Sequence, residues 1–190
     1  MHTVVVVDSE FGNTFQLAEI IAAELGAGGP VELINVRAPT GRDPLPADID
    51  LFVVGGPTQM HRVSVPLSQY LDGLPPRFLT QVASASFDTR LRGWPVLTGA
   101  AAGGISRRLK KLGANAVVPP ESFLVMGKEG PLAEGELERA RMWAKEVLLR
   151  LGSARHLPVR PPEDSARNAG RSCCQTRRPV RAGRGGQSLF

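Results

Sequence analysis

Apolar runs of strand length alternate with amphipathic segments of helix length along the first 151 residues. Residues 3–7 are mostly β-branched and apolar, without charged interruption, which is typical of a strand buried on both faces. Apolar positions then recur at helical spacing from Leu17 to Leu25, and Gly26 is placed to end that helix. A strand followed by a helix is the first part of a βαβ unit, so the pattern predicts a parallel sheet.

Further strands and helices complete this pattern. We expect strands at residues 31–36, 51–54 and 82–87, and a fifth at 115–118 and 122–126 that Pro119 and Pro120 interrupt. Helices are expected after Ser64 with Pro66 in the first turn, around residues 105–112, and over about residues 134–151. The sequence therefore predicts an α/β fold, a three-layer, doubly wound, five-stranded parallel sheet with right-handed crossovers.

The charge distribution divides the chain of 190 residues into two parts. Residues 1–151 contain 15 lysines and arginines against 16 aspartates and glutamates, a net charge of −1, whereas residues 152–190 contain 8 against 2, a net charge of +6. We expect residues 1–151 to form one domain and residues 152–190 to be a disordered basic tail, because the tail has few large apolar side chains. The tail lacks interleaved aromatic residues, which disfavours nucleic-acid binding.

The chain shows no pattern of export or membrane insertion. Its start lacks the basic region and long apolar stretch of a secretion signal, and no run of about eighteen apolar residues occurs. We therefore expect a cytoplasmic protein without a membrane span. Cys173 and Cys174 are adjacent in the tail, which is neither a disulfide framework nor a metal-ligand spacing.

The turn after the first strand carries the clearest chemical signal. Ser9, Asn13 and Thr14 supply hydroxyl and amide groups, and successive backbone N–H groups at a helix N-terminus favour an anion. The turn has no lysine and matches neither G-x-x-x-x-G-K-[ST] nor G-x-G-x-x-G, which disfavours triphosphate and dinucleotide turns. A phosphate monoester fits this turn, and simple capping of the helix is the alternative.

The sequence Ser9-Glu10-Phe11-Gly12-Asn13-Thr14 resembles the phosphate loop of the flavodoxins, whose pattern is Thr/Ser-x-Thr/x-Gly-Asn-Thr. The first 150 or so residues also follow the order of elements of short-chain flavodoxins. The resemblance implies strand order 2-1-3-4-5 and an FMN cofactor. It places the FMN phosphate on Ser9, Gly12, Asn13 and Thr14, with backbone N–H groups from Glu10 and Phe11.

The resemblance also implies that the isoalloxazine ring lies between the loops after strands three and four. By position, these loops contain the other candidate cofactor-binding residues, Pro57, Thr58, Gln59, Met60, His61, Phe87, Asp88, Thr89, Arg90 and Trp94. The sequence departs from the family pattern here, because its only tyrosine, Tyr70, lies inside a predicted helix. Trp94 could replace the tyrosine that stacks on the ring in many flavodoxins, or it could fill the edge of the core.

Several of these loop residues have two interpretations. Met60 could pack on the ring or fill the core, and His61 could bond the flavin or donate a proton, or be an exposed loop residue. Asp88, Arg90 and Arg92 could bind an anion or form a surface salt bridge.

Three functions follow from the resemblance, and no catalytic residue is assigned. An FMN-binding electron carrier that docks redox partner proteins is favoured, although a core charge of −1 lacks the acidity usual in such carriers. The alternatives are an NAD(P)H:quinone-type reductase with a small-molecule electron acceptor, and a flavin-free binding module. Hydrolase and metalloenzyme functions are disfavoured because we find no Ser-His-Asp set and no carboxylate cluster at metal spacing.

Overall fold

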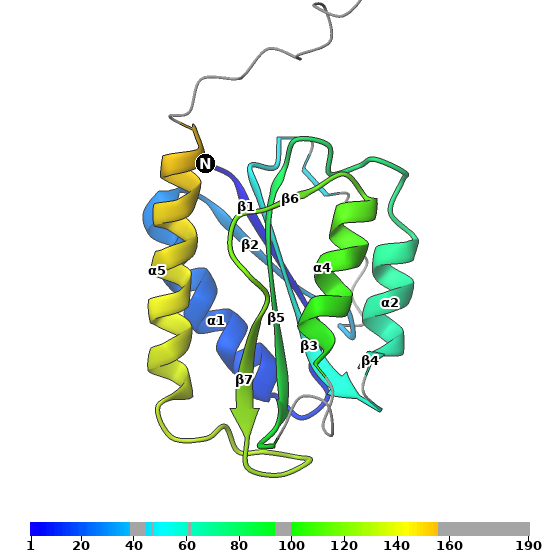
Figure 1. The fold of residues 1–190 in the computed structure, drawn as a ribbon, viewed down its shortest axis with the longest axis vertical. Helices are drawn as coiled ribbons and strands as arrows, with labels where there is room; N and C mark the ends of the chain where they lie inside the picture. The colour runs from blue at the N-terminus through cyan, green and yellow to red at the C-terminus, as the bar shows by residue number, and fades with distance from the viewer. Residues whose placement is uncertain (39–44, 47, 61, 94–99, 156–190) are drawn as a thin grey trace, which may run out of the picture. The chain divides into compact units, whose positions relative to one another are not determined.

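The computed structural model describes residues 1–38, 45–46, 48–60, 62–93 and 100–155 (Figure 1). These residues form a mostly parallel sheet with helices on both faces. The predicted basic tail from residue 156 onward lies outside the described residues, so the proposed domain boundary stays a prediction. No helix in the described ranges is long and apolar enough to cross a membrane.

The sheet has strand order β2-β1-β3-β5-β6, which confirms the predicted doubly wound class. Its strands are β1 (Thr3–Val7), β2 (Val31–Asn35), β3 (Leu51–Gln59), β4 (Arg62–Val63), β5 (Ala83–Leu91), β6 (Asn115–Ala116) and β7 (Glu121–Val125). The described residues thus form seven strands rather than the five predicted. The short β4 pairs antiparallel with β3, and the expected fifth strand is divided into β6 and β7, which both pair with β5. Pro119 and Pro120 lie at this division and have no N–H to donate.

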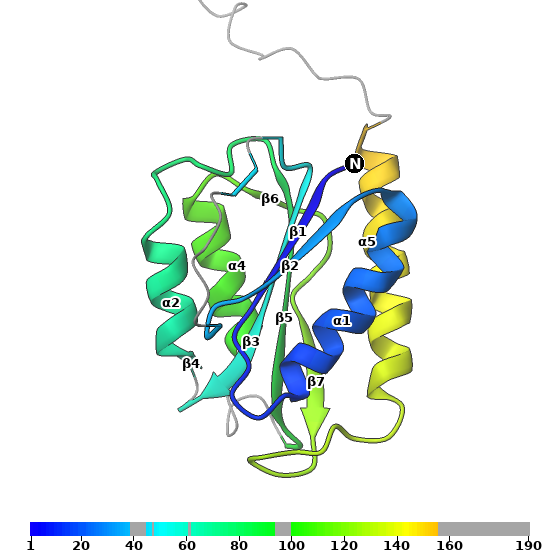
Figure 2. The same cartoon turned by 180° about the vertical axis from the view of Figure 1, so that it is seen from behind.

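Helices cover both faces of the sheet (Figures 1 and 2). One face is covered by α1 (Asn13–Leu25), which runs into the 3₁₀ turn η1 (Gly26–Gly28), and by α5 (Glu136–Arg155); the other is covered by α2 (Val65–Asp72) and α4 (Ala101–Lys111). Because side chains alternate along a strand, Val5 and Val7 join the α1–α5 core, and Val4 and Val6 join the α2–α4 core. Burial on both faces explains the apolar run of β1.

An aromatic cluster lies in the α1–α5 core, against β5 and β7. Phe87 meets Phe123 and Trp143 edge to face, with ring centroids 5.9 and 5.8 Å away, and Phe123 and Trp143 lie 6.2 Å apart. The backbone of Gly55 allows this packing, because a Cβ there would lie 2.1 Å from the Phe87 ring.

Strands β3 and β5 extend further than the sequence predicted. β5 runs to Leu91 because it pairs with β3 as far as Thr89 and with β7 as far as its own last residue. Asp88, Thr89 and Arg90, expected in a loop, are therefore strand residues whose side chains alternate between the two faces. Backbone pairing on both sides outweighs the weak strand propensity of these polar residues.

Candidate functional site

A pocket with a volume of about 560 Å³ lies at the carboxyl ends of the parallel strands. It is formed by the turn after β1, the residues after β2, the ends of β3 and β5, and the loop after β7. Its lining residues are Ser9, Glu10, Phe11, Asn13, Thr14, Arg37, Pro57, Thr58, Gln59, Met60, Thr89, Arg90, Leu91, Val125 and Lys128. This is the edge at which ligands bind in doubly wound sheets.

Most of the candidate residues inferred from the sequence meet in this pocket. They include Ser9, Glu10, Phe11, Asn13 and Thr14 from the turn, Pro57, Thr58, Gln59 and Met60 from β3 and the position after it, and Thr89 and Arg90 from β5. Met60 is 93 % exposed at the rim, so the interpretation of Met60 as a core residue does not hold. His61 and Trp94 lie outside the described residues, and their roles stay predictions.

Three candidate residues, Gly12, Phe87 and Asp88, do not line the pocket. Gly12 is the N-cap of α1 and takes a left-handed conformation, with φ 88°, that favours glycine. Phe87 is fully buried in the aromatic cluster, because an odd position on β5 faces α1 and α5. Asp88 faces the opposite side, where it is also fully buried.

Asp88 holds the N-terminus of α4. Its Oδ2 accepts hydrogen bonds from the Thr58 hydroxyl and from the Ala102 N–H, both at 2.9 Å, and the Thr58 Oγ1 accepts the Ala101 N–H at 2.9 Å. The carboxylate satisfies the Ala102 N–H and complements the helix dipole. Asp88 therefore ties β3, β5 and α4 together rather than forming a surface salt bridge.

The turn between β1 and α1 presents a series of backbone donors. The Gln16 N–H makes the first helical bond to the Gly12 carbonyl, and the Phe15 N–H donates to Ser9 Oγ at 3.1 Å. The backbone N–H groups of residues 10–14 have no hydrogen-bond acceptor among the described residues. The N-cap residue, Gly12, has no side chain that could accept these N–H groups, so they stay available to an anion.

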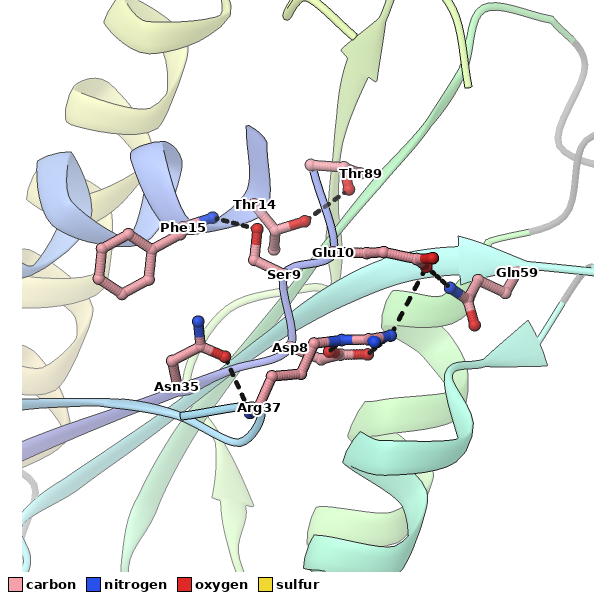
Figure 3. Close-up of polar contacts among 9 residues, drawn as sticks. All are labelled: Asp8, Ser9, Glu10, Thr14, Phe15, Asn35, Arg37, Gln59 and Thr89. Atoms are coloured by element: carbon pink, nitrogen blue, oxygen red, sulfur yellow. Dashed lines mark hydrogen bonds and ion pairs between the residues drawn. The ribbon is translucent and has the colours of Figure 1, made fainter. Parts of the chain in front are cut away.

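The side chains of the turn keep donor hydrogens although they bond within the protein (Figure 3). The Thr14 and Thr89 hydroxyls are 2.9 Å apart, and since one hydrogen lies between them, the other hydroxyl hydrogen can be donated elsewhere. Asn13 Nδ2 uses one of its two hydrogens on the Glu129 carbonyl at 2.9 Å. Within the described part of the chain Ser9 Oγ accepts one hydrogen bond and donates none, so its O–H remains a donor.

A charged cluster occupies the pocket wall near β2. Arg37 Nε donates to Oδ1 of the fully buried Asp8, while its Nη2 lies 3.5 Å from Asp8 Oδ2 and 3.6 Å from Glu10 Oε2 (Figure 3). Gln59 Nε2 donates to Glu10 Oε2 at 2.8 Å. The hydrogen bond from Arg37 to Asp8 raises the pKa of the guanidinium above its ordinary value, with Coulombic contributions from Asp8 and Glu10 and an opposing effect of burial. Arg37 is therefore a fixed cation of this wall.

Four lining residues, Arg37, Leu91, Val125 and Lys128, were not among the candidates. Arg37 follows β2 and Lys128 follows β7, so the rule that binding residues lie at the carboxyl ends of strands would have indicated both. Lys128 brings a cation to a pocket in which the turn at residues 9–14 contains no lysine. Nowhere in the described ranges do three or more His, Cys, Asp or Glu residues form a group that could hold a metal ion.

Comparisons with known proteins identify the fold. No protein-family model matches the sequence, and no curated protein matches it significantly. Flavodoxin 1 from Bacillus cereus is a structural match with a TM-score of 0.62 and 18% identity, covering 83% of this chain and 100% of that chain. A flavodoxin, WrbA-like protein from Agrobacterium tumefaciens matches with a TM-score of 0.58 and 19% identity, over 81% and 97% of the two chains.

A third match is to part of a larger protein. Rubredoxin oxygen:oxidoreductase from Desulfovibrio gigas matches with a TM-score of 0.60 and 15% identity, over 82% of this chain and 37% of that chain. At these identities the likeness shows the fold alone. The described chain has a flavodoxin-like fold.

Proposed function

We propose that this flavodoxin-like chain binds FMN in the pocket at the carboxyl edge of its sheet and takes part in electron transfer. The observation that carries the proposal is the set of backbone N–H groups at residues 10–14 that have no acceptor among the described residues, next to the donor hydrogens of Ser9, Asn13 and the Thr14–Thr89 pair. A phosphate monoester accepts several hydrogen bonds, and this turn offers donors without a triphosphate motif. The residues present therefore fit the FMN phosphate.

One part of the pocket lining is apolar and suits a flat, largely apolar ring. Pro57, Met60 and Leu91 line it, and Met60 and Leu91 are 93 % and 45 % exposed at its rim. Thr58 holds the end of β3 to Asp88 and to α4, so this wall is fixed before a ligand arrives. A preorganised wall lowers the entropic cost of binding.

FMN, when bound, would supply electron or hydride exchange. The chain's own residues would hold the phosphate through neutral donors, keep the Pro57–Met60 segment in place and leave an opening through which a partner reaches the cofactor. Docking of a redox partner protein at this opening is our favoured role for the chain.

A flavin-dependent NAD(P)H:quinone-type reductase is the second candidate. The exposed side chains of Phe11, Met60 and Leu91 around the pocket favour it, because an apolar rim suits a small apolar electron acceptor. A reductase would oxidise NAD(P)H with a quinone in a purified mixture, whereas a carrier would need a separate reductase. A flavin-free binding module is the third candidate.

The first experiment is to purify the full chain, incubate it with FMN and record the visible spectrum after removal of unbound flavin. We expect one FMN per chain with the absorption of an oxidised flavoprotein, released by acid. Colourless protein that takes up no added FMN would exclude both the carrier and the reductase and favour the binding module.

A second prediction tests the phosphate assignment. The double variant Asn13→Ala with Thr14→Val removes an amide donor and a hydroxyl, each worth about 1 to 3 kcal/mol where the acceptor is charged. We expect FMN affinity to fall at least tenfold in a fluorescence titration, while affinity for riboflavin, which lacks the phosphate, changes little.

Thr80→Val, at an exposed hydroxyl outside the pocket, is the matched control. Equal losses for FMN and riboflavin would remove the phosphate from this turn.

A further inference from the structure

We propose that Arg37 is a positioning residue that holds the Glu10 carboxylate away from the donors of the turn and thereby allows a turn containing a carboxylate to take an anionic phosphate monoester. The inference rests on the proposed function in one respect, since it requires the turn to bind a phosphate group. It adds a determinant from another part of the chain, because Arg37 follows β2 whereas Glu10 lies in the turn after β1.

Glu10 is an unfavourable residue in an anion-binding turn. It follows Ser9 directly, its side chain is 42 % exposed, and it lines the same pocket as Asn13 and Thr14. A carboxylate within about 10 Å of a phosphate dianion would repel it, and even with the solvent screening of a side chain that is 42 % exposed this repulsion lowers affinity by about tenfold or more. The Glu10 carboxylate therefore has to be held away from the phosphate.

The structure shows where the Glu10 carboxylate is held. Its Oε2 accepts a hydrogen bond from Gln59 Nε2 at 2.8 Å and lies 3.6 Å from Arg37 Nη2. Figure 3 shows the carboxylate directed toward Gln59 and Arg37 rather than toward Thr14 and its partner Thr89. The Glu10 carboxylate is thus held by Gln59 and Arg37 on the side away from Thr14.

Arg37 is itself held by hydrogen bonds to Asp8 and Asn35. Asp8, fully buried at the end of β1, accepts hydrogen bonds from Nε and Nη2 of Arg37, and the Arg37 backbone N–H donates to Asn35 Oδ1 at 3.0 Å. A guanidinium offers five donors in a fixed plane, so it can bond Asp8 and still face a second carboxylate. Asp8 orients Arg37, and Arg37 in turn holds the Glu10 carboxylate.

The test compares a charge-neutral double variant with a triple variant. Asp8→Asn with Arg37→Met removes both members of the buried pair, leaves the net charge of the chain unchanged and leaves Glu10 without its cation. The triple variant adds Glu10→Gln, and a control triple variant adds Glu19→Gln instead, at an exposed position of α1 outside the pocket. Circular dichroism and thermal melts establish that each variant is folded.

We expect the double variant to bind FMN about tenfold more weakly than the wild type and riboflavin about equally, because the Glu10 carboxylate loses the contact with Arg37 that holds it away from Thr14. Glu10→Gln should restore FMN affinity to within about threefold of the wild type, and Glu19→Gln should not. Failure of Glu10→Gln to restore binding, or an equal loss for riboflavin, would overturn the inference.

The proposed function and this inference fail in different ways. If the wild type binds no FMN but is stabilised thermally by inorganic phosphate, and the double variant is not, the FMN proposal falls and the role of Arg37 stands. If the wild type responds to neither FMN nor phosphate, both proposals fall. If it binds FMN and all variants bind equally well, the inference alone falls.

Discussion

Replacing Phe87 with alanine is expected to lower the free energy of unfolding by about 3 to 5 kcal/mol, because the change leaves a cavity in a fully buried aromatic cluster. The Phe87 ring packs edge to face against Phe123 and Trp143 and lies across the backbone of Gly55. The neighbouring rings pack on one another and β3 is paired on both sides, so we expect most of the cavity to stay unfilled. Urea denaturation followed by circular dichroism measures the loss.

Two variants separate the core role of Phe87 from the role in ring binding inferred from the sequence. Phe87→Leu keeps much of the apolar volume, so we expect a smaller loss of stability and FMN affinity close to that of the wild type. Val65→Ala, at a side chain that is 65 % exposed, should change stability by less than about 0.5 kcal/mol. A large loss of FMN affinity in folded Phe87→Leu protein would indicate that Phe87 contacts the cofactor.

Replacing Arg37 with methionine is expected to destabilise the fold by about 3 kcal/mol, because it leaves the carboxylate of Asp8 buried and unpaired. The value lies at the lower end of the range for buried pairs, since the Arg37 side chain is 34 % exposed and water can reach this cluster from one side. Chemical denaturation of the variant at neutral pH measures the effect.

The matched comparison is again the double variant Asp8→Asn with Arg37→Met. It removes the buried charge together with its partner, so we expect it to recover most of the lost stability. Equal stability of Arg37→Met and the wild type would contradict the importance of this pair. The anion-binding test uses the double variant for this reason.

The order of strands and helices could be predicted because most elements show a local pattern of apolar and polar residues. The β-branched run of β1 and the helical spacing from Leu17 to Leu25 each identify an element without reference to the rest of the chain. Pro119 and Pro120 marked the division of the last strand, which the structure places between β6 and β7. The ends of β3 and β5 could not be predicted, because pairing with neighbouring strands extends both of them.

The candidate site was predictable only where its residues are contiguous. The turn at residues 9–14 carries its hydroxyls, its amide and its left-handed glycine within one segment, so the sequence alone indicated an anion site there. Candidate residues chosen only because they follow a predicted strand did not all reach the pocket. Phe87 and Asp88 lie on opposite faces of β5 and line no part of the pocket, because both precede the strand end that the sequence placed too early.

The amino-acid sequence by itself therefore determined the α/β class, the position of the donor-rich turn after β1 and the absence of a triphosphate motif, since each depends on residues close together in the chain. Only the tertiary structure decided that Thr14 meets Thr89, that Asp88 caps α4 and that Arg37 pairs with Asp8 and Glu10. These contacts join segments up to 75 residues apart. Which side chains meet across such a separation depends on strand order and register, and these are properties of the whole sheet rather than of any segment.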